Sequence, residues 1–125
     1  MKVSELVPPL LDHWVARAEG FTLKGRWWCR ADEEWCTGEH FAPSTRWAIS
    51  GPIIERDLIT TVAWEVGQWS AYVGAQGTYL DVKPGWDNEC QGPTALIAAM
   101  RAFVVSKFGA EVSDAVDSGP RAEFS

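Results

Sequence analysis

The chain has 125 residues, of which 46% are hydrophobic, and its formal net charge is −6. This length suits a single domain, and the apolar content is enough for a core that needs neither disulfides nor a metal to fold. The acidic balance argues against broad electrostatic binding to nucleic acid or to an anionic membrane, and no apolar run reaches the length of a membrane span. We therefore expect a cytoplasmic domain whose three cysteines are reduced.

An amphipathic helix is predicted over residues 8–20, because apolar side chains recur there with helical spacing. Two prolines near its start are tolerated only in the first turn, which places the beginning of the helix near Pro8. Gly20 marks the end, and Phe21 is positioned to make the apolar contact of a Schellman-type C-terminus. Asp12 falls on the polar side of this helix and is expected to face solvent.

Short β segments occupy the middle of the chain, where apolar and β-branched residues alternate with polar ones. In chain order, the predicted strands are residues 21–23, 26–30, 60–66, 68–74 and 78–82. Gly51-Pro52 is expected to break the chain between a short segment at 47–49 and a stretch at 53–59 whose type the pattern does not decide. Residues 84–91 are expected to form a loop that leads into the last helix.

The stretch from Gly92 to Gly109 predicts a second helix with clear signals at both ends. Pro93 suits the first helical position, and Gly109 suits a left-handed residue just past the end. One face carries large apolar side chains, and the other carries mainly small ones: Ala95, Ala98, Ala102 and Val105. A helix that is apolar all round packs on two sides, so we expect a sheet against the large face. The small-residue face should meet a second helix or a second subunit, and packing inside the chain is the commoner arrangement.

The order of helix, strands and helix predicts an α+β domain over residues 1–112. Its expected architecture is a small antiparallel sheet with the N-terminal and the C-terminal helix packed on one face. No internal repeat or linker divides the sequence, which supports one domain. Residues 113–125 are acidic and contain Gly119-Pro120, so we expect a disordered tail.

Three separated blocks of sequence carry a resemblance to a known family. They are Lys2-Val3-Ser4-Glu5-Leu6 with Leu10-Leu11-Asp12 and Trp14-Val15-Ala16; Ser44-Thr45-Arg46-Trp47 with Gly51-Pro52-Ile53-Ile54-Glu55-Arg56; and Gly92-Pro93-Thr94 through Ala99-Met100-Arg101-Ala102 to Ser106-Lys107-Phe108-Gly109. In this order they resemble the NinX-like family of small proteins from tailed phages and integrated prophages. The resemblance implies a phage or prophage origin and an accessory protein made inside a bacterial host. It implies no catalytic motif, so no active-site residue carries over.

The candidate metal ligands are Cys29, Cys36 and His40, with Cys90 as a distant fourth. Zinc needs four thiolate or imidazole ligands in a tetrahedron, and no C-x-x-C pair is present in this chain. Scattered reduced cysteines beside a surface histidine account for the pattern, so we expect no metal and no cofactor. The chain also lacks a G-x-S-x-G elbow, a phosphate-binding glycine loop and an H-E-x-x-H motif. We therefore expect a protein that is not an enzyme.

Eight tryptophans are many for a chain of this length. Packing in the core and the sheet is the leading explanation for them. The alternatives are a protein-binding patch, in which Trp and Arg are common anchors, and stacking of single-stranded nucleic acid on rings beside cations. If residues 26–30 form a regular strand, Trp27 and Trp28 point to opposite faces, and one of them is then a candidate exposed aromatic.

These observations predict a non-enzymatic phage accessory protein that acts by contact with a host or phage protein, or with a second copy of itself. The candidate partner-binding residues are Trp27, Trp28, Trp47, Glu55 and Arg56. The alternative is a nucleic-acid-associated accessory in phage replication or recombination, suggested by the neighbouring Arg and Trp residues. The negative net charge stands against this alternative. No membrane partner is expected.

Overall fold

The computed structural model describes residues 1–24, 27–29, 36–37, 41–74 and 89–113. It confirms the predicted α+β class. The helices are η1 (3₁₀, Val3–Glu5), α1 (Leu10–Ala18), α2 (Trp47–Arg56) and α3 (Ala95–Phe108). The strands are β1 (Thr22–Lys24), β2 (Trp27–Cys29), β3 (Cys36–Thr37), β4 (Thr60–Glu65), β5 (Gln68–Tyr72) and β6 (Cys90–Gly92). They form two antiparallel sheets, in the orders β1-β2-β3 and β4-β5-β6, where a single sheet was expected.

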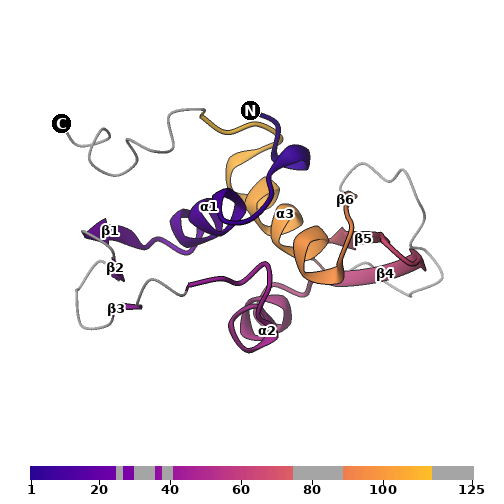
Figure 1. Cartoon of the computed structure of the whole chain (residues 1–125), viewed down its shortest axis with the longest axis horizontal. Helices are drawn as coiled ribbons and strands as arrows, with labels where there is room; N and C mark the ends of the chain where they lie inside the picture. Colours follow the sequence, from indigo (N-terminus) through magenta and orange to yellow (C-terminus); the bar gives the residue numbers. More distant parts are fainter. Residues whose placement is uncertain (25–26, 30–35, 38–40, 75–88, 114–125) are drawn as a thin grey trace.

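The last helix, α3, lies at the centre of the fold. It packs between α1 and the sheet β4-β5-β6, and α2 contacts it from a third direction (Figure 1). Every residue from Ala95 to Val104 is buried. Burial of this helix on all sides confirms that it packs on more than one face, and the small-residue face is covered within the chain rather than by a second subunit. Met100 and Phe103, two large side chains of this helix, are fully buried and so remove a large apolar area from water.

Both ends of α3 are fixed by local signals. The hydroxyl of Thr94 accepts a hydrogen bond from the backbone N–H of Ile97 at 3.1 Å, so Thr94 is the N-cap. Pro93 therefore precedes the cap, and the prediction that it occupies the first helical position is wrong. Gly109 ends the helix with φ +90°, as predicted, and its N–H donates to the carbonyl of Val105.

The strand before α3 was predicted as loop, and that prediction is wrong. Cys90–Gly92 forms β6, which pairs with β5 and lies against α3. Gly92 makes this close approach possible, because a Cβ atom there would lie 2.8 Å from the backbone nitrogen of Ala98. A pattern of three residues is too short to show a period of two, which is why the strand escaped detection. The predicted strand at residues 78–82 lies outside the described residues.

The N-terminal helix ends as its sequence predicts. Gly20 has φ +87°, its N–H donates to the carbonyl of Arg17, and the N–H of Phe21 donates to the carbonyl of Ala16. These two bonds are those of a Schellman motif. The helix begins at Leu10, after a turn that contains the cis peptide bond Pro8-Pro9, rather than near Pro8.

Asp12 corrects the predicted solvent face of α1. Its side chain is only 6% exposed, and Oδ1 accepts a hydrogen bond of 2.8 Å from the backbone N–H of Ser44. Burial raises the pKa of the Asp12 carboxyl, while the hydrogen bonds from Ser44 oppose that rise. Asp12 therefore ties α1 to the segment that leads into α2.

Gly51-Pro52 does not break the chain, contrary to the prediction. Both residues lie inside α2. Proline keeps a φ that a helix accepts, but it removes one backbone hydrogen bond and its ring crowds the carbonyl of the preceding turn. Ile53, which is buried in the core, supplies the packing that offsets this loss.

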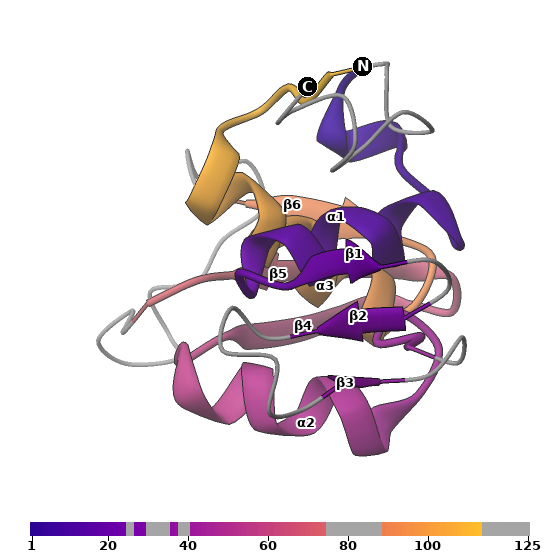
Figure 2. The ribbon, with the colours of Figure 1, turned by 90° about the vertical axis from the view of Figure 1, so that its left-hand side faces the viewer.

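The two ends of the described chain lie side by side (Figure 2). The N–H of Val3 donates to the carbonyl of Ala110, and the N–H of Val112 donates to the carbonyl of Met1. Lys2 and Glu111 form an isolated antiparallel bridge between these bonds. Residues 114–125, which include nearly all of the predicted disordered tail, lie outside the described residues.

Candidate functional site

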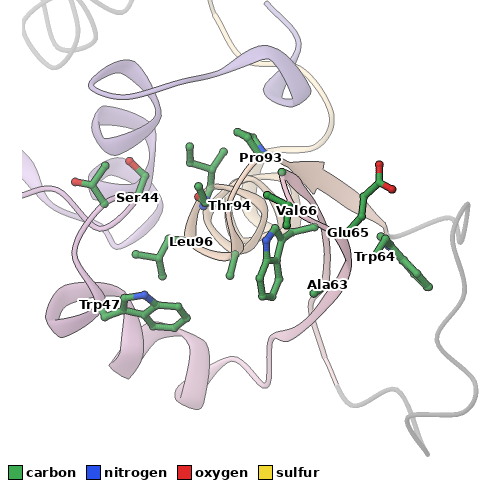
Figure 3. A pocket seen from close by; sticks show the side chains of 14 residues that line it. Ser44, Trp47, Ala63, Trp64, Glu65, Val66, Pro93, Thr94 and Leu96 are labelled. Atoms are coloured by element: carbon green, nitrogen blue, oxygen red, sulfur yellow. The ribbon is translucent and has the colours of Figure 1, made fainter.

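Three of the exposed large apolar side chains, Trp47, Trp64 and Val66, belong to residues that line an open groove of about 910 Å³. Trp47 comes from the first turn of α2, Val66 from the loop between β4 and β5, and the start of α3 lies between them (Figure 3). This surface, the hairpin groove, is lined by residues 44–45, Trp47, residues 63–67, Trp69 and residues 93–97. Trp47 is 60% exposed and Val66 is fully exposed, so the groove offers apolar area that the described part of the chain leaves uncovered.

The β4–β5 hairpin shapes one wall of the hairpin groove. Its two-residue loop, Val66-Gly67, is closed by the pairing of Glu65 with Gln68, and Gly67 has φ +82°. A positive φ at the second loop position is readily adopted only by glycine among common residues. The tight loop leaves Val66 at the tip of the hairpin.

A register shift between Ala63 and Glu65 changes the direction of Trp64. Figure 3 shows the Trp64 ring pointing away from Trp47, toward the other side of the hairpin. There its Nε1–H donates to the hydroxyl of Ser70 at 2.7 Å. Such irregularities commonly redirect a side chain at the edge of a sheet.

A smaller and more polar pocket of about 440 Å³ adjoins the hairpin groove and shares four of its lining residues. This surface, the Arg101 pocket, is lined by Ser4, Trp64, Gly67, Gln68, Trp69, Gln91, Gly92, Pro93 and Arg101. Arg101 is only 8% exposed. Its Nε donates to the carbonyl of Leu6 at 2.9 Å, and Nη1 donates to the carbonyl of Gln91 at 2.7 Å. Burial lowers the pKa of Arg101.

A chain of polar contacts borders the Arg101 pocket. The Ser70 hydroxyl, which accepts from Trp64, donates to the carboxylate of Glu89. The side-chain amide of Gln91 donates to the same carboxylate at 3.2 Å. These contacts hold the edge strand β6 and the Trp64 ring in place beside the pocket.

The structure separates the partner-binding residues that the sequence suggested. Trp47 lines the hairpin groove, whereas Glu55 and Arg56 lie at the far end of α2 and do not line it. Arg56 donates to Glu19 and to Asp57, each at 2.8 Å, and so joins α2 to the end of α1. The hydrogen bonds to the carboxylates of Asp57 and Glu19 raise the pKa of Arg56, and the negative charges of these groups add to the rise.

Trp27 and Trp28 point to opposite faces of β2, as the alternation of strand residues predicts. Trp27 is 51% exposed, whereas Trp28 is 8% exposed and belongs to the core. Trp27 is therefore the exposed candidate of the pair. It does not line the hairpin groove.

Sequence reasoning missed the hairpin as part of a site. Trp64, Val66 and Trp69 line the groove, but none was singled out as a binding residue. The signal in the sequence was the Val66-Gly67 loop, which has Trp64 before it and Trp69 after it. The start of α3 follows about 25 residues later. Only the pairing of β5 with β6 brings that helix start to the hairpin.

The prediction that all three cysteines are reduced is wrong. Cys29 is disulfide-bonded, and the backbone register of β2 and β3 places Cys29 opposite Cys36. Cys90 is a free thiol, and burial raises its pKa to about 11, so it is protonated at neutral pH. The cysteine count therefore no longer supports a cytoplasmic location, which stays a prediction.

A disulfide-bonded Cys29 cannot serve as a thiolate ligand for zinc in this state. Within residues 1–24, 27–29, 36–37, 41–74 and 89–113, no group of three His, Cys, Asp or Glu side chains is arranged to hold a metal. His40 lies outside these residues. In the same described part of the chain, no helix is both long and apolar enough to cross a membrane.

Comparison with known families gives a match that spans nearly all of the described residues. The family model described as "Bacteriophage P22, NinX" matches residues 2–107. The matched range contains every residue that lines the hairpin groove and the Arg101 pocket. No curated protein sequence matches the chain.

Proposed function

The chain belongs to the bacteriophage P22 NinX family, and from this premise we propose that this phage accessory protein binds a protein partner through the hairpin groove. The observation that carries the proposal is the exposed apolar surface of Trp47 and Val66 around one open groove. Apolar surface that is gathered in one place and edged by polar residues is typical of protein-binding sites. Tryptophan is among the side chains that most often dominate binding energy.

The lining of the hairpin groove favours a protein over a nucleic acid. Its described lining residues include no Lys or Arg, and Glu65 adds a negative charge at the hairpin. Proteins that stack single-stranded nucleic acid on aromatic rings also need cations that follow the phosphate backbone. A nucleic acid would therefore meet apolar area and an acidic rim here, without compensation for its phosphates.

The proposal predicts that the Trp47→Ala variant loses its partner. Removal of a central tryptophan from an interface costs about 2 kcal/mol or more, which corresponds to roughly 30-fold weaker binding. The measurement is a tagged capture from lysate of phage-infected host cells, with nuclease treatment and quantification of each captured protein by mass spectrometry. Trp27→Ala is the matched control, because Trp27 is similarly exposed but lies outside the groove.

Three outcomes of this capture are informative. A protein retained by wild type and by Trp27→Ala, but depleted for Trp47→Ala, supports the hairpin groove. Loss on Trp27→Ala with retention on Trp47→Ala would move the binding surface to the sheet β1-β2-β3 and overturn the proposal. Recovery that disappears on nuclease treatment would favour the nucleic-acid alternative.

A further inference from the structure

Arg101 is a buried cation without a carboxylate partner among the described residues. Its Nε and Nη1 donate to the backbone carbonyls of Leu6 and Gln91, and no hydrogen bond joins Nη2 to the part of the chain that the structure describes. A charged group that is more than nine-tenths buried is costly unless an opposite charge or a full set of hydrogen bonds compensates it. Two neutral carbonyls satisfy part of the donor capacity of a guanidinium and none of its charge.

The described surroundings of Arg101 form an open pocket whose lining is polar and apolar in about equal parts. The Ser4 hydroxyl and the side-chain amides of Gln68 and Gln91 line the same pocket. The pocket can therefore surround an anion with hydrogen-bond donors.

The Arg101 pocket is continuous with the hairpin groove. Both surfaces include Trp64, Gly67, Trp69 and Pro93. An apolar surface and a cationic pocket thus lie side by side along one hairpin. This arrangement suits a segment that carries an apolar group and an acidic group on neighbouring residues.

We propose that the Arg101 pocket binds a carboxylate of the protein partner, next to an apolar side chain that enters the hairpin groove. The proposal rests on the function proposed above and specifies the chemistry of the bound peptide segment. Arginine and carboxylate form strong, charge-assisted hydrogen bonds. A carboxylate, with one negative charge, matches the single guanidinium. A phosphate group would bring nearly two charges close to Glu65 and Glu89.

The test is a titration of the ¹⁵N-labelled full chain with N-acetyl-leucine, followed by NMR. The matched probe is N-acetyl-leucinamide, which has the same side chain but no charge. We expect saturable shifts of the Arg101 Nε–H and Trp69 Nε1–H signals, with a dissociation constant for the acid at least about 10-fold below that for the amide. Equal binding of the two probes would overturn the proposal. Inorganic phosphate that displaces the acid at lower concentration would also overturn it in favour of a phosphate ligand.

Two variants locate the binding site. Arg101→Gln should abolish the preference for the acid over the amide. Because this change could unfold the chain, Gln68→Glu is the second variant: it adds a negative charge to the pocket at an exposed position. Gln68→Glu should weaken the binding of N-acetyl-leucine at least about 5-fold and leave the binding of N-acetyl-leucinamide unchanged. Ser106→Glu is the control: it adds the same charge on α3 outside the pocket and should weaken the binding of neither probe.

The outcomes separate this inference from the proposed function. If Trp47→Ala loses the captured partner while Gln68→Glu keeps it and binds both probes as wild type does, the hairpin groove stands and the carboxylate site is wrong. If the acid binds Arg101 selectively but Trp47→Ala retains the partner, the carboxylate site stands and the groove is not the docking surface.

Discussion

His13 illustrates how one half-buried side chain couples this fold to pH. Its ring lies 5.6 Å from the ring of Trp14 and 5.1 Å from that of Trp28, and its buried Nε2 has no hydrogen-bond partner among the described residues. Burial, assisted by the positive charge of Arg17, lowers the pKa of His13 from 6.5 to about 4. The folded state therefore holds His13 neutral in a pH range where the unfolded chain protonates it.

The sign of the pH effect follows from this difference. Between about pH 6.5 and pH 4 the unfolded state binds more protons at His13, so stability falls as the pH falls through that window. Above pH 6.5 His13 contributes no pH dependence. His13→Phe keeps a ring between the two tryptophans and should remove this part of the acid sensitivity. Urea unfolding of wild type and His13→Phe at pH 7.0, 5.5 and 4.5 measures this difference. An equal fall in the free energy of unfolding of both proteins would show that His13 is not its cause.

At the residue scale, the sequence predicts what depends on neighbours along the chain. The opposite directions of Trp27 and Trp28 follow from strand geometry alone. The burial of Asp12 does not, because its partner Ser44 is 32 residues away and only the tertiary fold brings the two together. The disulfide of Cys29 likewise depends on strand pairing, which a count of cysteines does not show.

At the scale of elements, the contact between β6 and α3 depends on the absence of a side chain at Gly92. An alanine there would place its Cβ 2.8 Å from the backbone nitrogen of Ala98, and neither backbone can move freely. Gly92→Ala should therefore destabilise the fold by about 1–3 kcal/mol, the usual cost of overpacking. Gly51→Ala is the control, because open space surrounds that position. Its effect should stay within about 1 kcal/mol.

Chemical denaturation of both glycine variants decides this prediction. If Gly92→Ala lowers the free energy of unfolding no more than Gly51→Ala does, β6 moves away from α3 without cost. The Arg101 pocket and the hairpin groove both use this contact, so such a result would also weaken their geometry.

Elements with local end signals were predicted well, and elements without them were not. The Schellman end of α1 and the glycine end of α3 are encoded within a few residues. The helix α2 was missed because Pro52 normally disfavours a helix interior, and tertiary packing of Ile53 outweighs that local cost. The hairpin groove was missed as a whole, because it joins α2, the β4–β5 hairpin and α3 across some fifty residues of sequence.

At the scale of the whole molecule, the pairing of the two ends predicts a specific pattern of hydrogen exchange. The N–H of Val3 is bonded to Ala110, and the Val3 side chain is fully buried. We expect this amide to exchange only with global unfolding, at the rate of the α3 amides. The amide of Val112, which is less buried, should exchange faster through local fraying. An unprotected Val3 amide, measured by NMR in D₂O, would show that η1 detaches from the rest of the fold.

The contacts of Arg101 affect how the chain folds during its synthesis. Its guanidinium joins the carbonyls of Leu6 and Gln91 across the molecule, and α1 also packs on α3. The segments that leave the ribosome first thus find their packing partner among the segments that leave it late. Contacts so distant in sequence form slowly, and their apolar surfaces stay uncovered until then. The nascent chain can therefore complete its core only after α3 is synthesised.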